Sequence, residues 1–283
     1  MDHRSTVDLA PEHRQRPGDA GAAPEAPRPV ERRPKALRAV LFACDGLLAD
    51  SAGCWAQARA ERFEAHGLPY GPAEDAALRA LSPAGAAAVM AKRFGLGGDP
   101  RALAEIEEEV VRAGVARLRA GCRPMPGARQ FVIRVGRRLP VAILSPLPRV
   151  ALDATLTAVG LAEAAAVTVA GDEVDAPWPA PDLHLAACRA LGIATRHVLA
   201  FEAGAEGLRA ARAAGPATVG VLAPGTDGTA GATGVPAPAH APVPCGPPAP
   251  RPAPVEPPAP PRADHLAPSL ADPRLLAWID GWA

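Results

Sequence analysis

The sequence has few aromatic residues and no excess charge, and these two shortages exclude several classes of protein. Only 4% of its 283 residues are aromatic, and 30 Lys and Arg balance 30 Asp and Glu, so the formal net charge is zero. A nucleic-acid-binding domain carries a basic footprint that is missing here, so we expect no nucleic-acid partner. A chain of this length holds one medium domain with an insertion, or two small domains.

The chain also lacks long apolar runs and paired cysteines. No run of about eighteen apolar residues is present that would cross a bilayer, so we expect no membrane partner. Roughly the first thirty residues are polar and contain no apolar secretory core, which favours a cytoplasmic location. The five cysteines are scattered and form no Cys-x-x-Cys spacing, so we expect reduced thiols and no zinc site.

Proline-rich segments flank the part of the chain that shows regular periodicity. Residues 1–36 mix Pro, Arg, Glu and Ala without periodicity and are predicted to form a disordered tail. Residues 224–270 carry repeated Pro-Ala and Pro-Pro steps and are predicted to be an extended linker without a packed core. Residues 271–283 are predicted to form a short amphipathic helix, because Asp272-Pro273 is a helix-start signal.

This last helix is a candidate for binding a partner protein. An isolated helix so short is marginal in water, so it must dock onto something if it forms. Tryptophan anchors dominate many interfaces, and the candidate contact residues are Leu275, Trp278, Ile279 and Trp282. Packing of the same helix onto its own domain is an equally good interpretation.

Between the two proline-rich segments, short apolar strands alternate with amphipathic helices. Residues 37–50 and 123–223 are predicted to form a Rossmann-like, doubly wound α/β core, with a parallel sheet covered on both faces. Residues 51–122 are helical throughout in pattern and are predicted to form an inserted, all-helical cap. In such a sheet the ligand site lies beyond the carboxyl ends of the strands, where Ala43 and Ser145 fall.

Four motifs follow one another at these strand ends. Residues 39–51 are an apolar strand followed by Ala-Cys-Asp-Gly, two leucines and Ala-Asp-Ser, and the strand 141–144 ends in Ser145. Residues 177–182 read Pro-Trp-Pro-Ala-Pro-Asp, and residues 201–204 read Phe-Glu-Ala-Gly. In order and interval the four motifs resemble the signature of the haloacid dehalogenase superfamily. The helical insert is similar to the cap of its beta-phosphoglucomutase and phosphoglycolate-phosphatase branch.

The resemblance implies a catalytic set that this chain has in large part lost. In that family the first motif supplies a nucleophilic aspartate that also binds magnesium, and here Ala43 takes its place. Asp45 retains the family's general acid or base. Trp178 replaces a phosphate-balancing lysine, and Ala203 replaces a magnesium-binding aspartate. We therefore expect none of the usual catalysis, no bound metal and no cofactor.

The retained residues imply a ligand pocket whose ligand the sequence does not identify. Asp45 and Gly46 begin the first loop, Ser145 stands at the family's phosphoryl-binding hydroxyl, and Glu202 belongs to the fourth motif. Without the lysine or magnesium, each carboxylate at about 4 Å repels a phosphate dianion by roughly several kcal/mol per unit charge.

We therefore predict a catalytically inactive member of the fold with a binding or regulatory role. Loss of an essential nucleophile costs on the order of a millionfold in turnover. The alternative is a phosphatase-type hydrolase of a small phosphomonoester with a rearranged site, in which Asp45, Glu202 or Asp50 acts as an unorthodox base. A diverging gene product with a stable fold and no selected role is also consistent with the sequence.

Overall fold

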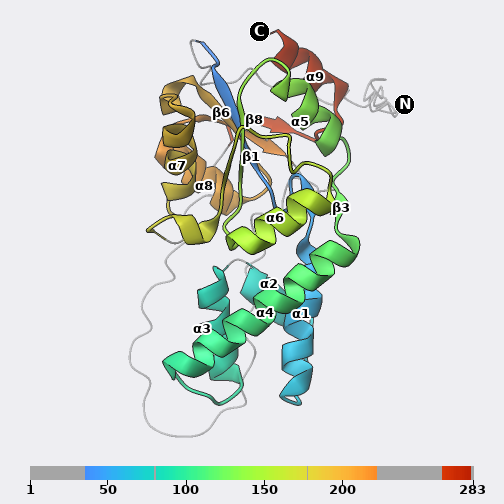
Figure 1. The fold of residues 1–283 in the computed structure, drawn as a ribbon, viewed down its shortest axis with the longest axis vertical. Helices are drawn as coiled ribbons and strands as arrows, with labels where there is room; N and C mark the ends of the chain where they lie inside the picture. Colours follow the sequence, from blue (N-terminus) through green and yellow to red (C-terminus); the bar gives the residue numbers. More distant parts are fainter. Residues whose placement is uncertain (1–35, 80, 177, 222–262, 282–283) are drawn as a thin grey trace, which may run out of the picture.

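The structure is a computed structural model that describes residues 36–221 and 263–281, apart from residues 80 and 177. Within that part of the chain, an α/β domain lies above a group of four helices (Figure 1). The predicted tail 1–36 falls outside the described residues except for Ala36, and most of the predicted linker 224–270 does so too. Among the described helices, none is both long and apolar enough to cross a membrane.

The α/β domain is built on a sheet of six strands in the order β5-β4-β1-β6-β7-β8, and every paired strand runs parallel to its neighbour. The strands are β1 (Ala39–Ala43), β4 (Val141–Leu144), β5 (Val167–Val169), β6 (Val198–Glu202), β7 (Ala217–Val221) and β8 (His265–Ala267). The residues of β4, β6 and β7 are all buried, as continuous apolar runs require in a sheet covered on both faces.

Helices cover the two faces of this sheet, and alternate side chains of β1 pack against them. Val40 and Phe42 face one cluster, which includes α5, α6 and α9, whereas Ala39 and Leu41 face the other, which includes α7 and α8. These helices are α5 (Ala128–Gly136), α6 (Arg149–Ala158), α7 (Asp182–Leu191), α8 (Ala205–Ala214) and α9 (Pro273–Asp280). Short 3-10 turns span Gly171–Glu173 and Thr195–His197. The predicted doubly wound α/β core is therefore confirmed.

The helical cap follows β1 and returns to the sheet before α5. It consists of α1 (Ala52–Ala65), α2 (Pro72–Arg79), α3 (Pro83–Arg93) and α4 (Pro100–Gly121). At its base, the short antiparallel strands β2 (Ala49–Asp50) and β3 (Arg123–Pro124) pair the two connections to the core. Three of the four helices begin with proline, whose fixed φ and missing N–H suit the first helical position. The cap lies next to the carboxyl end of β1, since residues of both line one pocket.

The predicted linker differs from the structure in its last part. Residues 263–270 pack on the core, because β8 pairs with β7 and both Ala267 and Leu270 are buried. The Asp264 carboxylate accepts hydrogen bonds from the Thr218 backbone N–H at 2.8 Å and from its hydroxyl at 2.9 Å. A high proline content predicts a segment that forms no strand, because proline cannot donate a backbone hydrogen bond to a sheet. The segment His265–Ala267 contains no proline, so its backbone N–H groups can pair with the edge of the sheet.

The C-terminal helix packs on its own domain. In α9, which lies beside α5 (Figure 1), Leu275 and Ile279 are buried in the core. The Asp280 carboxylate accepts hydrogen bonds from Arg134 of α5 and from Arg138 in the turn that follows it. Trp278 is partly buried and stacks on His265 with ring centroids 5.2 Å apart. Trp282 lies outside the described residues. Three of the four predicted contact residues thus already make contacts inside the chain, and a partner at this helix stays a prediction.

Candidate functional site

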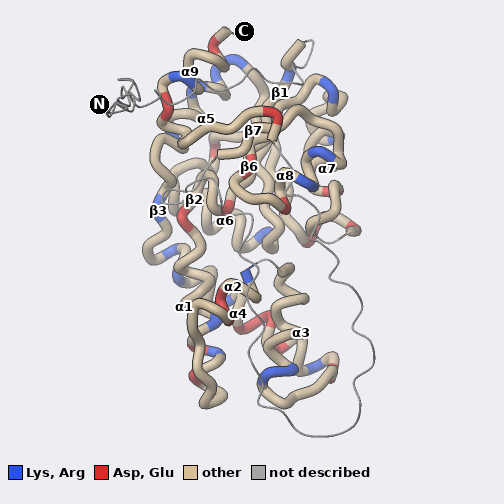
Figure 2. Tube along the Cα trace, turned by 180° about the vertical axis from the view of Figure 1, so that it is seen from behind, with Lys and Arg blue, Asp and Glu red and all other residues tan. Residues whose placement is uncertain are grey.

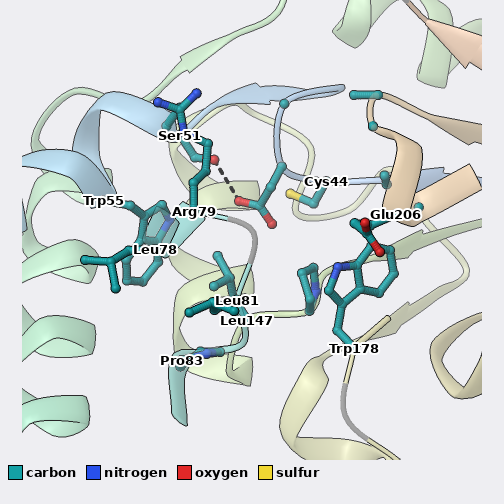
Figure 3. A pocket seen from close by; sticks show the side chains of 18 of the residues that line it. Cys44, Ser51, Trp55, Leu78, Arg79, Leu81, Pro83, Leu147, Trp178 and Glu206 are labelled. Atoms are coloured by element: carbon teal, nitrogen blue, oxygen red, sulfur yellow. Dashed lines mark hydrogen bonds between the residues drawn. The ribbon is translucent and has the colours of Figure 1, made fainter. Parts of the chain in front are cut away.

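A pocket of about 840 Å³ lies between the carboxyl ends of the central strands and the cap (Figure 3). From the core, its wall includes the residues after β1, the start of the loop after β4, Trp178 and the turn between β6 and α8. All four cap helices contribute side chains to the opposite wall. This is where ligands bind in open parallel sheets, outside the carboxyl ends of the strands.

Two serine hydroxyls hold the Asp45 side chain just beyond the carboxyl end of β1. Ser51 Oγ donates to Asp45 Oδ1 at 2.7 Å, and Ser145 Oγ donates to Oδ2 at 2.6 Å. The turn between them depends on Gly46, whose φ of +74° is the left-handed conformation that favours glycine. Burial raises the pKa of Asp45, and the two serine hydrogen bonds offset only part of this rise.

Ser145, the hydroxyl for which the resemblance implies ligand binding, contacts Asp45 in the structure. Its side chain is fully buried and its hydroxyl, besides donating to Asp45, accepts the backbone N–H of Leu147 at 3.1 Å. Asp45, Gly46 and Glu202 line the pocket, but Ser145 lies behind them. The hydroxyl therefore orients Asp45 instead of facing the cavity.

Glu202 forms a buried pair that the sequence analysis did not foresee. Its Oε1 lies 2.7 Å from Nε2 of His184 on α7, and both side chains are almost inaccessible to solvent. The Trp178 ring stacks on His184 with centroids 6.5 Å apart. Gly207 makes room for the carboxylate, since a Cβ there would lie 2.0 Å from Glu202 Oε2. A single histidine in an amphipathic helix gives no sequence signal of such a contact.

The three replaced positions come together at this pocket. Ala43, Trp178 and Ala203 all line it, and a Cβ placed on Gly46 would touch the methyl group of Ala203 at 3.7 Å. The spatial convergence that the motifs predict is therefore observed. At the end of β1, where the family resemblance implies an attacking carboxylate, Ala43 presents only a methyl group.

These residues do not fit the magnesium ion that the family resemblance implies. Magnesium prefers near-octahedral oxygen ligation, whereas Ala43 and Ala203 offer no side-chain oxygen and Glu202 is engaged with His184. Within the described ranges, no group of three or more His, Cys, Asp or Glu side chains is placed to hold a metal ion.

Two arginines that line the pocket are held by a carboxylate of the cap. Arg59 Nη2 lies 2.5 Å from Asp75 Oδ1, Arg79 contacts the other oxygen, and the Tyr70 hydroxyl donates to Asp75 at 2.7 Å. Burial alone would raise the pKa of Asp75, but the hydrogen bonds from Arg79, Arg59 and Tyr70 lower it to about 2. One carboxylate thus holds two guanidinium groups, and the three groups together keep a net positive charge.

The cysteine thiols near the pocket are poor nucleophiles. Cys44 is fully buried, and burial, with the nearby Asp45 charge, raises its pKa well above the ordinary value. Burial likewise raises the pKa of Cys122 to about 12. The four cysteines that the structure describes are all free thiols, as expected, whereas Cys245 lies outside the described residues.

Comparison with known proteins points to one family. A model of haloacid dehalogenase-like hydrolases matches residues 37–215. Protein CbbY of Rhodobacter capsulatus is 33% identical over 193 residues, which cover 63% of this chain and 82% of CbbY. The N-acetylmuramic acid 6-phosphate phosphatase of Pseudomonas aeruginosa is 28% identical over 186 residues, which cover 65% of this chain and 81% of that protein.

Solved structures agree with the sequence matches. The structure of CbbY from Rhodobacter sphaeroides in complex with phosphate superposes with a TM-score of 0.58 at 25% identity, covering 66% of this chain and 86% of that one. The superfamily that the four motifs indicate and the branch that the helical insert indicates are thereby confirmed.

Proposed function

Since the chain belongs to the haloacid dehalogenase-like hydrolase family, we propose that it binds a small molecule in the cap–core pocket without performing phosphoryl transfer through an aspartate. The observation that carries this proposal is the methyl group of Ala43 at the end of β1. A methyl group has no lone pair to attack phosphorus. Removing an essential nucleophile typically costs on the order of a millionfold in turnover.

Three side chains beside Ala43 in the described part of the pocket are poorly placed to take over as nucleophile. Cys44 is buried with a raised pKa, so that its thiol is protonated at neutral pH. Both oxygens of Asp45 are occupied by serine hydroxyls. Glu202 is held by His184. The pocket can therefore hold a ligand, but none of these three side chains is placed to attack phosphorus.

The charges of the pocket also favour binding over phosphoryl transfer. The cation of the third motif is replaced by Trp178, and Arg59 and Arg79 are bound to Asp75. A transferring phosphoryl group needs positive charge at its oxygens, which in this family comes from lysine and magnesium.

A turnover assay tests the proposal. We expect the purified chain with Mg²⁺ to hydrolyse no member of a phosphomonoester panel above the rate of a heat-denatured sample. The triple variant Ala43→Asp, Trp178→Lys, Ala203→Asp restores the missing groups and serves as the positive comparison. Magnesium-dependent turnover by the unchanged chain would refute the proposal.

A second candidate is a phosphatase-type hydrolase of a small phosphomonoester with a rearranged site. The relatives support it more directly than they support the first candidate, because one of them is a phosphatase of N-acetylmuramic acid 6-phosphate. Its chemical support is Asp45, whose raised pKa moves it toward the range of a general base at neutral pH.

In this second candidate, water attacks phosphorus, Asp45 takes a proton from that water, and the bond from phosphorus to the leaving oxygen breaks. The leaving oxygen takes its proton from solvent. If this candidate is correct, Asp45→Asn abolishes the turnover of the unchanged chain while the variant remains folded. Retained turnover in Asp45→Asn would exclude Asp45 as the base.

A cytoplasmic location and a protein partner are kept as proposals. A partner at the C-terminal helix would have to meet the side that α9 leaves outside the core, because Leu275 and Ile279 are buried. A pull-down that compares the unchanged chain with one ending near Pro268 tests it, and identical partners from both would remove α9 as the contact.

A further inference from the structure

The pocket has the size and the wall of a site for a molecule with an apolar body. Its volume of about 840 Å³ falls within the range of roughly 300–1,000 Å³ of small-molecule sites. On the cap side the wall is formed by apolar side chains, among them Trp55, Leu78, Met90, Val110 and Val111. On the core side, Met125, Leu147 and Trp178 continue the apolar surface.

The core end of the same pocket is acidic. Four carboxylates line it, namely Asp45, Asp50, Glu202 and Glu206. Figure 2 shows acidic positions, with basic ones among them, on the side of the core that faces the cap. Two of the four carboxylates have partners, since Glu202 pairs with His184 and Glu206 pairs with Arg209. Asp50 is exposed. A fifth acid, Glu107, reaches the pocket from the cap.

The positive charge among the lining residues does not balance these acids. Arg59 and Arg79 are held by Asp75, which itself is not part of the wall. The third arginine, Arg123, lies in β3 directly opposite Asp50 in the β2–β3 pair. The lining carboxylates still outnumber the lining arginines, and this excess favours a cationic ligand over an anionic one.

Two tryptophans stand on opposite sides of this space, with the hydrogen bond from Ser51 to Asp45 between them (Figure 3). The Trp55 side chain presses its six-membered ring against α4, since a Cβ on Gly114 would lie 2.4 Å from Trp55 Cζ3. Its Nε1, on the other edge of the indole, is buried without a hydrogen-bond partner. This donor can be met only by an acceptor atom carried on the body of a ligand.

We propose that the ligand of the pocket is a small organic cation, an amine with an aromatic or aliphatic body, and not a phosphate ester. The carboxylates at the core end attract the ammonium group, and the faces of Trp55 and Trp178 contact the apolar body and the cation. This inference names the ligand class of the proposed binding function and rests on it.

Four naphthyl compounds of similar body and different charge test the inference. They are 2-(1-naphthyl)ethylamine, 2-(1-naphthyl)ethanol, the carboxylate 1-naphthaleneacetate and 1-naphthyl phosphate. Each is titrated into the full chain by calorimetry at pH 7 and low salt. We expect the amine to bind about tenfold tighter than the alcohol, and the two anions to bind more weakly than the alcohol. Added salt should reduce the preference for the amine, because screening weakens exposed charge interactions.

Matched variants separate charge from shape. We expect Asp50→Asn to weaken binding of the amine by about threefold or more and to leave the affinity for the alcohol unchanged. The control Asp153→Asn removes an exposed carboxylate of α6 that is not part of the wall and should change neither affinity. Trp178→Ala should weaken the amine and the alcohol together, because both use the aromatic face.

Three outcomes overturn the inference: binding of the alcohol as tightly as the amine, tighter binding of either anion, or no saturable binding by any of the four compounds. Failure of the proposed function is measured separately, as magnesium-dependent release of 1-naphthol from 1-naphthyl phosphate. A chain that hydrolyses the phosphate yet prefers the amine would refute the first proposal and leave the ligand class standing.

Discussion

Two carboxylates, Asp75 in the cap and Asp45 at the end of β1, have opposite surroundings. Asp75 contacts two arginines and a tyrosine hydroxyl, and these lower its pKa to about 2 although burial acts in the other direction. Asp45 has only two serine hydroxyls, and burial raises its pKa. Two of the arginines that border the pocket are thus held in a structural cluster of the cap, whereas carboxylates line its core end.

This difference explains why similarity of fold does not extend to the chemistry of the site. The cap cluster is complete, because every charged member has a partner of opposite charge. The core cluster keeps the frame around Asp45, but its neighbours at the strand ends are methyl groups and an indole. Fold-level similarity therefore supports the family, and the site decides the function.

The largest expected effect comes from breaking the cap cluster. Asp75→Ala leaves the buried Arg59 guanidinium without a carboxylate, and we expect a loss of about 3–5 kcal/mol in the free energy of unfolding. Urea denaturation followed by circular dichroism measures it. The control Glu105→Ala removes an exposed partner of Arg101 and should cost less than about 1 kcal/mol. Equal costs for the two variants would contradict a special role of the Asp75 cluster.

A smaller effect is expected at the core cluster from Gly207→Ala. The new Cβ would lie 2.0 Å from Glu202 Oε2, so the carboxylate must move and its contact with His184 is disturbed. We expect a cost of about 1–3 kcal/mol, typical of overpacking in a buried region. The control Gly53→Ala, at an exposed position of α1, meets no atom within 4 Å and should be near neutral or slightly stabilising. Indistinguishable melting temperatures for the two variants would argue against the Glu202–His184 geometry.

The two carboxylates should also give opposite dependences of stability on pH. The folded pKa of Asp75 is about 2, below its ordinary value of 3.8, so the unfolded chain binds more protons between these values. Its contribution is therefore present above about pH 4 and is lost as the pH falls toward 2. A comparison of melting temperature against pH for the unchanged chain and Asp75→Asn tests this, and we expect the acid-side slope to be smaller in the variant.

The smallest expected effect is that of Asp45→Asn on stability. Because the folded pKa of Asp45 is raised above 3.8, the folded chain binds the extra proton, and stability falls as the pH rises above the unfolded pKa. Replacement by a neutral amide should therefore remove this decline and raise the melting temperature at pH 7. If the variant melts at a lower temperature than the unchanged chain at pH 7 but at the same temperature at pH 4, the folded protein favours the charged form of Asp45 instead.

Much of the fold was predictable, because its signals are local in sequence. Apolar runs such as Val141–Leu144 mark buried parallel strands, and a wholly helical stretch after β1 marks the cap. The prediction failed at β8, where a three-residue strand hidden in proline-rich sequence joins the sheet edge through contacts with β7 and Thr218. Composition averages over such a segment, so a short proline-free window is overlooked.

The candidate site divides in a similar way. The motifs place Ala43, Trp178 and Ala203 at one pocket, because strand ends of a parallel sheet meet on one edge, and the structure agrees. The motifs say nothing of His184, whose contact with Glu202 joins α7 to the end of β6. They also do not reveal that the Ser145 hydroxyl donates to Asp45, and its role in ligand binding stays a prediction.

The sequence alone determined which atoms are present, and thus that the family's attacking carboxylate, its lysine and one metal ligand are missing. Tertiary structure alone decided the state of the groups that remain. It brought Arg59 and Arg79 onto Asp75, closed Glu202 against His184 and laid the C-terminal helix on α5. The physical reason is that charge pairing and burial depend on distances between residues far apart in the chain, which local patterns do not encode.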